Sequence, residues 1–187
     1  GVPTEFAAMQ AGHTVLDRGA GAGNDVFIAR REVGESGRVI GVDFTPDMVA
    51  KAESNRAKLG YDNVEFRQGE IEDLPVCDAV VDVVISNCVL NLVPDKAAAF
   101  SGIHRVLKPG GHFFFFVIVL AGNLPDELRK AAEFYVGCVA GALQKKDYLA
   151  NITAQGFQSI EILKEREIQI PDTDLREHLS EEELTSF

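Results

Sequence analysis

The chain has 187 residues, a length that fits one domain with one substantial core. Its hydrophobic fraction of 46% and charged fraction of 25% are those of an ordinary globular protein. The net charge of −11 disfavours nucleic acid and anionic membranes as general partners, because both are negatively charged. The longest strongly apolar run, 113–120, is too short to span a bilayer, and nothing at the N-terminus resembles a signal peptide, so we expect a cytoplasmic protein.

Strand-like and helix-like segments alternate along the chain. Periodicity predicts strands at 14–17, 38–43, 64–67, 79–86, 113–120 and within 157–170, and helices at 24–32, 46–59, 95–107, 126–143 and 147–155. Thr45 is placed to cap the second helix, Pro46 suits its first position and Gly60 ends it. A Lys-Pro-Gly-Gly turn is expected at 108–111.

Regular alternation of strands and helices predicts an α/β fold: a Rossmann-like, doubly wound, mostly parallel sheet in a single domain, 1–187. Its core should include Val15, Ile40, 83–85 and 114–116. Ligands of such sheets bind at the carboxyl ends of the strands, near the point where the strand order reverses.

A glycine-rich loop follows the first expected strand. Asp17 stands two residues before Gly19, Gly21 and Gly23, and glycines at alternate positions let a ligand approach the backbone closely. The spacing does not match the dinucleotide fingerprint G-x-G-x-x-G, which disfavours a nicotinamide-dependent dehydrogenase. It suits a ligand with an ammonium group and no pyrophosphate. Asp43, at the tip of the second strand, can accept hydrogen bonds from both ribose hydroxyls of such a ligand.

Four motifs, in this order, make the chain resemble the class I S-adenosylmethionine-dependent methyltransferases. They are the loop from Asp17 to Gly23, the acid Asp43, the stretch Gly69-Glu-Ile-Glu72-Asp-Leu-Pro75 and the turn Leu107-Lys-Pro-Gly-Gly111. The resemblance implies S-adenosylmethionine as the cofactor, with its adenine beside Glu70 and Ile71. The cofactor-binding residues that it implies are Asp17, Gly19, Ala20, Gly21, Gly23, Asp43, Phe44, Glu70, Ile71, Glu72, Ser86 and Asn87. Arg18 departs from the family, because this position is usually apolar there.

Two further stretches resemble the arsenite methyltransferases. They are Ser86-Asn-Cys-Val-Leu-Asn-Leu-Val-Pro-Asp-Lys96 and Tyr135-Val-Gly-Cys-Val-Ala-Gly-Ala142. The resemblance implies that Cys88 and Cys138 bind a metalloid substrate, trivalent arsenic. As(III) prefers thiolates, and thiolate ligation leaves its lone pair free to attack the sulfonium methyl group. The thiols must lose their protons, through a lowered pKa or on binding.

Two protein thiolates leave one ligand position of As(III) open. A small thiol, which is also the expected reductant, would fill it, or a cysteine that arsenite methyltransferases carry upstream of the glycine loop. Residues 1–4 resemble the stretch just after that cysteine, and Ser180 to Glu183 form a capping box for a helix that has barely begun. We therefore expect a fragment truncated at both ends, with the last strand of the sheet missing.

Other interpretations stay open. Cys138 continues an apolar helical pattern through Leu128, Ala131 and Tyr135, so packing alone can explain it. In that case the protein methylates an organic small molecule, or it is a non-catalytic module that binds arsenite or the cofactor. Cys77 matches no ligand position and is expected to be a bystander thiol. The histidines show no metal-ligand spacing, so no metal site is expected.

Overall fold

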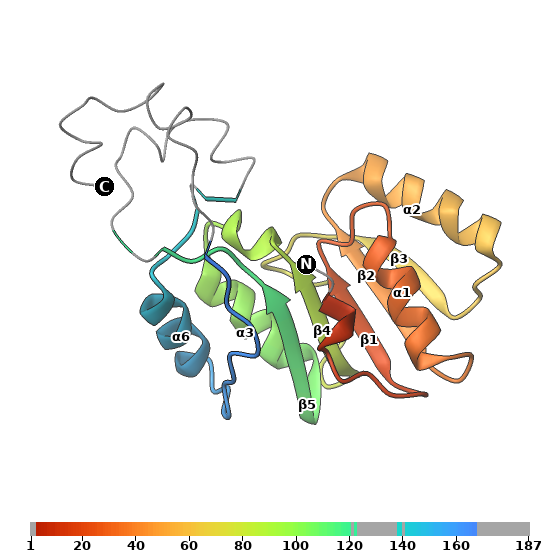
Figure 1. The fold of residues 1–187 in the computed structure, drawn as a ribbon. Coiled ribbons are helices and arrows are strands. Elements are labelled where there is room, and N and C mark those ends of the chain that lie inside the picture. The colour runs from red at the N-terminus through yellow and green to blue at the C-terminus, as the bar shows by residue number, and fades with distance from the viewer. Residues whose placement is uncertain (1–2, 121, 123–137, 140, 168–187) are drawn as a thin grey trace.

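The computed structural model describes residues 3–120, 122, 138–139 and 141–167. Within them lies a five-stranded parallel sheet with strand order β3-β2-β1-β4-β5 (Figure 1). The strands are β1 (Thr14–Arg18), β2 (Arg38–Asp43), β3 (Val64–Gln68), β4 (Val81–Asn87) and β5 (Leu107–Phe116). The helices are α1 (Asn24–Val33), α2 (Pro46–Leu59), α3 (Lys96–Val106) and α6 (Lys145–Ala154), with short 3-10 helices η1 (Pro3–Glu5) and η2 (Val89–Asn91). The Rossmann-like, doubly wound parallel fold is confirmed.

The ends of α2 follow local sequence signals, except for the cap at its start. Pro46 occupies the first turn of α2, and Gly60 ends the helix in the left-handed region, at φ 67°. The Thr45 side chain makes no capping hydrogen bond, so that prediction is wrong. Its backbone N–H donates to Asp43 instead, at 2.9 Å. None of the helices in the described part of the chain is long and apolar enough to cross a membrane.

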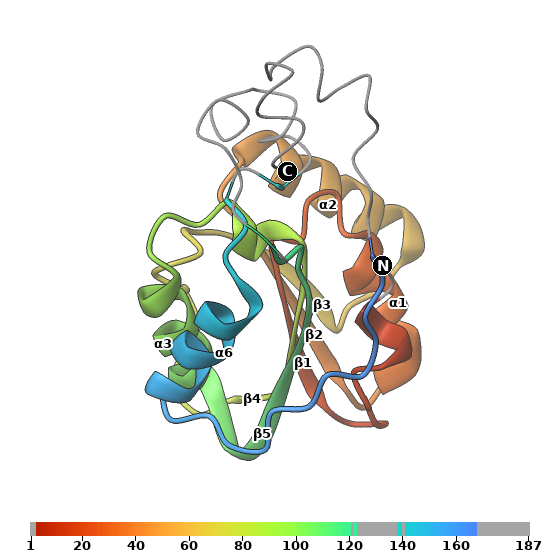
Figure 2. The same ribbon diagram turned by 60° about the vertical axis from the view of Figure 1, so that its left-hand side comes forward.

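Alternating strand residues build two cores on opposite faces of the sheet. Figure 2 shows that α3 and α6 cover one face and α1 covers the other. The first core joins Leu16, Ile40, Val42 and Val84 to Phe100, Ile103 and Val106 of α3 and to Tyr148 and Ile152 of α6. The second joins Val15, Val39, Val83 and Ile85 to Val26, Ala29 and Val33 of α1. The predicted core positions Val15, Ile40 and 83–85 are therefore confirmed.

The last strand differs from its prediction. β5 begins at Leu107 and ends at Phe116 instead of residue 120. It includes the expected turn at 108–111, where its pairing with β4 is irregular between Val81 and Val83. The side chains at 114–116 are only half-buried, because β5 is an edge strand of the sheet in the described residues. Within the described residues, the run of phenylalanines therefore lies in an edge strand and not in a central one.

Two other predicted elements are not found in the described residues. The stretch 157–167 contains no strand: Phe157 packs against Phe113, with ring centroids 4.6 Å apart, whereas Ile160, Ile162 and Leu163 are exposed. The described part of the helix expected at 126–143, residues 138–139 and 141–143, is not helical. Residues 126–137, 168–170 and the capping box at 180–183 lie outside the described residues.

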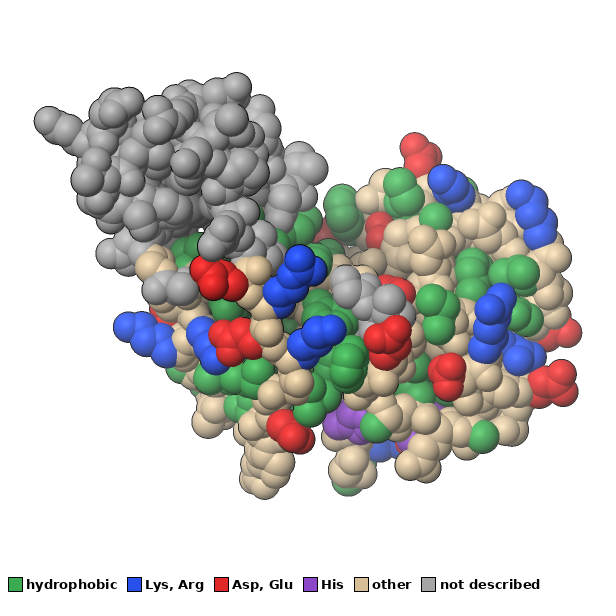
Figure 3. Space-filling model, in the orientation of Figure 1, with side chains coloured by type: hydrophobic (Ala, Val, Ile, Leu, Met, Phe, Trp, Pro, Cys, Tyr) green, Lys and Arg blue, Asp and Glu red, His purple; other side chains and the backbone are tan. Residues whose placement is uncertain are grey.

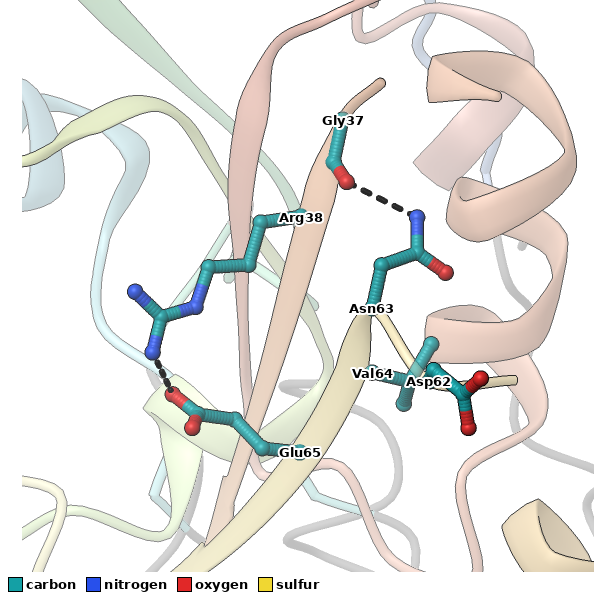
Figure 4. A pocket seen from close by; sticks show the side chains of 6 residues that line it. All are labelled: Gly37, Arg38, Asp62, Asn63, Val64 and Glu65. Carbon is teal, nitrogen blue, oxygen red and sulfur yellow. Dashed lines mark hydrogen bonds and ion pairs between the residues drawn. The ribbon is translucent and has the colours of Figure 1, made fainter. Parts of the chain in front are cut away.

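Asn63 closes the amino end of the sheet, where a shallow pocket of about 360 Å³ lies between the starts of β2 and β3 (Figure 4). Its side-chain amide donates to the carbonyls of Gly34 and Gly37, at 2.9 and 2.8 Å, and accepts from Arg30. The carboxyl ends of the strands, where ligands bind in this fold, lie at the opposite edge.

Candidate cofactor and thiol site

The glycine loop is attached to the end of β2 at the switch point between β1 and β4. The N–H groups of Gly19 and Ala20 donate to the Val42 carbonyl, at 2.8 and 3.0 Å. The N–H of Gly21 donates to the Asp43 carboxylate, at 2.8 Å. The predicted loop therefore lies where the fold places ligands, and hydrogen bonds to the end of β2 hold its backbone.

The loop needs its glycines for two reasons. Gly19, Gly21 and Gly23 have φ values of 81°, 52° and 94°, which side chains rarely adopt. A Cβ on Gly19 would lie 2.8 Å from the Val89 side chain, whereas the space beside Gly21 is open. The loop thus packs against the protein at Gly19, and at Gly21 it leaves room for a ligand against the backbone.

Asp17 is buried and lies near two other acids. Burial raises its pKa well above the ordinary value, and the negative charges of Asp25 and Asp43 raise it further. A bound ammonium group would offset this repulsion. The acid cluster therefore fits the amino group of S-adenosylmethionine.

Asp43 serves the protein backbone in this structure. One carboxylate oxygen accepts from Gly21, and the other accepts from Thr45 at 2.9 Å. Each oxygen can accept a second hydrogen bond, so the carboxylate still fits a ribose diol. Its contact with the ribose stays a prediction.

The loop after β3 is held by Arg18, a residue that sequence reasoning noticed only as a departure from the family. The buried guanidinium donates to the carbonyls of Ile71, at 2.6 Å, and Ala99, at 3.2 Å. Burial lowers the pKa of Arg18 to about 10, against the opposite effect of nearby Glu72. Arg18 thus joins β1, α3 and the stretch expected to lie beside the adenine. The sequence signal for these hydrogen bonds was the charge of Arg18 in an apolar strand.

The other expected cofactor residues differ in their surroundings. Ser86 is buried and donates its hydroxyl hydrogen bond to the Arg18 carbonyl, at 3.0 Å. Asn87 donates to Asp25 at 3.3 Å and so joins the acid cluster. Phe44 and Glu70 are exposed, Glu72 is half-buried and Ile71 is buried.

The two cysteines of the resemblance meet at the same edge. Cys88 directly follows β4, and its N–H donates to the Phe116 carbonyl at 2.9 Å. Cys138 stands in a turn at φ 63°, not on the predicted helix. Burial raises the pKa of the Cys138 thiol, and the neighbouring Cys88 raises it further. The backbones of the two cysteines lie close together, because Asn91 donates hydrogen bonds to both of their carbonyls. Cys77 is exposed and does not contribute to the raised pKa of Cys138.

Asn91 and Tyr148 were missed by sequence reasoning. The Asn91 amide donates to the carbonyls of Cys138, at 2.8 Å, and Ile118, at 3.0 Å, and accepts from the Tyr148 hydroxyl. Burial raises the pKa of Tyr148, as do Cys138 and Cys88. A polar residue three positions after Cys88, between Leu90 and Leu92, was the available signal for Asn91. The described residues form no cluster of three or more side chains that could hold a metal ion.

The burial of Cys138 and its proximity to Cys88 predict the pH dependence of Cys138 alkylation. Because its pKa is raised, Cys138 should react with iodoacetamide more slowly than free cysteine at neutral pH, and its rate should still rise above about pH 9. Cys88→Ser should lower the midpoint of this profile without restoring the ordinary value, because burial is the larger cause. Mass spectrometry of the labelled Cys138 peptide measures the rate. Identical profiles with and without Cys88 would contradict the proximity.

Comparisons with known proteins agree with this geometry. The family model described as a methyltransferase domain matches residues 9–156. The chain is 50% identical to an arsenite methyltransferase of Halobacterium salinarum over 87% of its length, which covers 41% of that protein. It is 38% identical to an arsenite methyltransferase of Aquipseudomonas alcaligenes, over 93% of this chain and 52% of the relative. The chain thus spans about half the length of these curated relatives.

A solved structure is similar throughout the fold. It is the X-ray crystal structure of CrArsM, an arsenic (III) S-adenosylmethionine methyltransferase from Chlamydomonas reinhardtii. The two chains superpose with a TM-score of 0.84 at 42% identity, over 95% of this chain and 62% of the other. The chain therefore belongs to the methyltransferase-domain family, as a class I S-adenosylmethionine-dependent methyltransferase that resembles the arsenite methyltransferases.

Proposed function

We propose that this protein transfers a methyl group from S-adenosylmethionine to trivalent arsenic held by the thiolates of Cys88 and Cys138. The observation that carries the proposal is the meeting of two thiols, from distant parts of the chain, beside the glycine loop. Val89, the residue after Cys88, packs against Gly19, and Asn91 donates hydrogen bonds to the carbonyls of both Cys88 and Cys138. The names of the relatives support the same substrate.

The proposed ligands suit the substrate because soft As(III) prefers sulfur to oxygen or nitrogen. Each thiol loses its proton as it binds, and an oxygen ligand of arsenite leaves as water. The raised pKa of Cys138 therefore selects deprotonation on binding over a preformed thiolate. A small thiol is the proposed third ligand, and a pair of such thiols is the proposed reductant.

The transfer needs little acid–base chemistry. When bound, S-adenosylmethionine supplies an electrophilic methyl group on a sulfonium. The arsenic lone pair forms the As–C bond, and the electron pair of the broken C–S bond returns to sulfur. The positive charge passes to arsenic, which becomes formally pentavalent. Two small thiols would return it to the trivalent state by forming a disulfide; one of their two protons leaves with the thiolate ligand displaced from arsenic, and the other is released. Since no proton leaves the attacking atom, the protein contributes positioning and exclusion of water.

The proposed roles of the cofactor residues follow from their surroundings. The cluster of Asp17, Asp25 and Asp43 would hold the ammonium group. The positive charge of that group would reduce the repulsion from Asp25 and Asp43 that contributes to the raised pKa of Asp17. Asp43 would also accept from the ribose. The adenine would lie beside Ile71, whose carbonyl Arg18 holds, and the exposed ring of Phe44 lies at the end of the neighbouring strand.

A cytoplasmic location fits the chemistry, since the three cysteines are free thiols and thiols persist in reducing compartments.

Basic and acidic side chains are interspersed over the coloured part of the face in Figure 3, as expected for a protein whose partner is a small molecule.

The test is an assay of the full-length protein with methyl-labelled S-adenosylmethionine, arsenite and glutathione. We expect labelled methylarsenicals, measured by chromatography coupled to mass spectrometry, and none when arsenite is left out. Cofactor binding without arsenic methylation would contradict the proposal. Turnover of the cofactor with an organic acceptor would then favour an organic substrate, and no turnover would favour a non-catalytic binding module.

A further inference from the structure

We propose that Asn91 is a positioning residue that sets the spacing of the Cys88 and Cys138 thiols; this inference rests on the proposed function. Asn91 is buried and contacts the backbone of both cysteines. Its N–H donates to the Cys88 carbonyl at 3.3 Å, and its side-chain amide donates to the Cys138 carbonyl at 2.8 Å. One residue thus connects two segments that are far apart in the sequence.

The side chain of Asn91 is fixed by its other hydrogen bonds. The second N–H of the amide donates to Ile118, and the amide oxygen accepts from the Tyr148 hydroxyl. A flipped amide would turn its oxygen toward two carbonyls, so the carbonyls of Cys138 and Ile118 select the observed orientation, and the Tyr148 hydroxyl holds the amide oxygen in it. Tyr148 is therefore a second positioning residue, one step removed from the thiols.

The turn that carries Cys138 also packs directly on the Asn91 backbone. A Cβ added to Gly141 would overlap the carbonyl oxygen of Asn91. Lys96 donates to the same carbonyl at 3.3 Å and to the Val93 carbonyl at 3.0 Å, which fixes the segment after Cys88. Contact at both ends of the turn leaves it little freedom to move relative to β4.

The need for such a residue follows from the backbone of the cysteines. Cys88 and Cys138 both have left-handed φ values, 62° and 63°, and belong to irregular segments. The directions of their thiols therefore depend on what holds those segments. A bidentate ligand gains its affinity from the second bond only if the two sulfurs are already at the right spacing.

The experiment uses phenylarsine oxide, whose arsenic binds two thiols, in the full-length protein with Cys77→Ser as background. Asn91→Leu keeps the side-chain size and removes the hydrogen bonds to Cys138, Ile118 and Tyr148. We expect its affinity for the probe to fall by about tenfold or more, the effect of losing buried hydrogen bonds that preorganise a site. Tyr148→Phe should have a smaller effect, because the bond from Asn91 to Cys138 remains.

Asn63→Leu is the matched control. Asn63 also bridges two carbonyls through its amide and accepts one hydrogen bond, but at the amino end of the sheet, as Figure 4 shows in part. It should lose similar thermal stability and keep the affinity for the probe. Alkylation of Cys88 by the monovalent reagent iodoacetamide, and cofactor binding, should stay within about twofold of the parent protein in the Asn91 variant, because neither needs the spacing of two thiols.

Unchanged probe affinity in Asn91→Leu, with affinity lost in Cys88→Ser and Cys138→Ser, would overturn the positioning role and leave the proposed function intact. An equal loss of affinity in Asn63→Leu would also overturn it, because general destabilisation would then explain the effect. Affinity that survives in both serine variants would contradict the arsenic site itself, and the positioning role with it.

Discussion

Replacing Cys88 or Cys138 by serine should abolish methyl transfer to arsenite, with a loss of about a hundredfold or more, because a hydroxyl is a poor ligand for soft As(III). Each thiol supplies one of the two protein bonds to arsenic, so the loss of either leaves the substrate held at one point. The cofactor should still bind within about twofold of the parent protein, because its expected ligands lie in the glycine loop and the acid cluster.

The control for this result is Cys77→Ser. Cys77 is exposed, and its serine variant should keep full activity. Methylated arsenic is measured by chromatography with mass spectrometry, and cofactor binding by calorimetry. Full activity in either Cys88→Ser or Cys138→Ser would contradict the ligand assignment and favour an organic substrate.

Asp43→Ala should weaken the binding of S-adenosylmethionine by roughly 1–3 kcal/mol, the range for a lost hydrogen-bonding carboxylate. Two causes add up. The ribose hydroxyls lose their proposed acceptor, and the N–H groups of Gly21 and Thr45 lose the carboxylate that fixes the loop and the start of α2. Asp43→Asn should have a smaller effect, since its one amide oxygen can still accept from the loop.

Calorimetry of the full-length protein measures this loss, and Asp47→Ala is the matched control. Asp47 is an exposed acid in the first turn of α2, so its variant has the same net charge without the contacts of Asp43. If both alanine variants bind the cofactor as tightly as the parent protein, the role of Asp43 is wrong. Preferred binding of NAD would contradict the cofactor itself.

The sequence predicted well what depends on neighbouring residues. The bounds of β2 and the glycine that ends α2 follow from local patterns, and the structure has them as expected. Cys138 could not be placed in this way, because an apolar helical period and a turn packed against Asn91 look alike in the sequence. The half-burial of the phenylalanines in β5 depends on what lies beside the edge of the sheet, which no local pattern contains.

In the candidate site, too, the residues that belong to local motifs were predicted and those that act through distant contacts were not. Its glycines and Asp17 form a contiguous motif and Asp43 ends the next strand, so they could be named from the sequence, whereas Asn91 and Tyr148 act only through contacts between distant segments. The acid cluster of Asp17, Asp25 and Asp43 is intermediate. Two of its members were expected at the site for other reasons, and Asp25 joins them only because α1 begins at the end of β1.

Arg18 constrains the position of the loop after β3 through directional hydrogen bonds as well as through packing. An apolar side chain at this position could slide against its neighbours, but a guanidinium with fixed donors toward Ile71 and Ala99 allows one arrangement of the loop. Lysine is therefore not an equivalent replacement here, since its single ammonium is a point charge without the fork that reaches both carbonyls. In this protein, the identity of residue 18 is constrained by the backbone positions of two other segments, so changes in α3 near Ala99 should alter the loop that is proposed to bind the adenine.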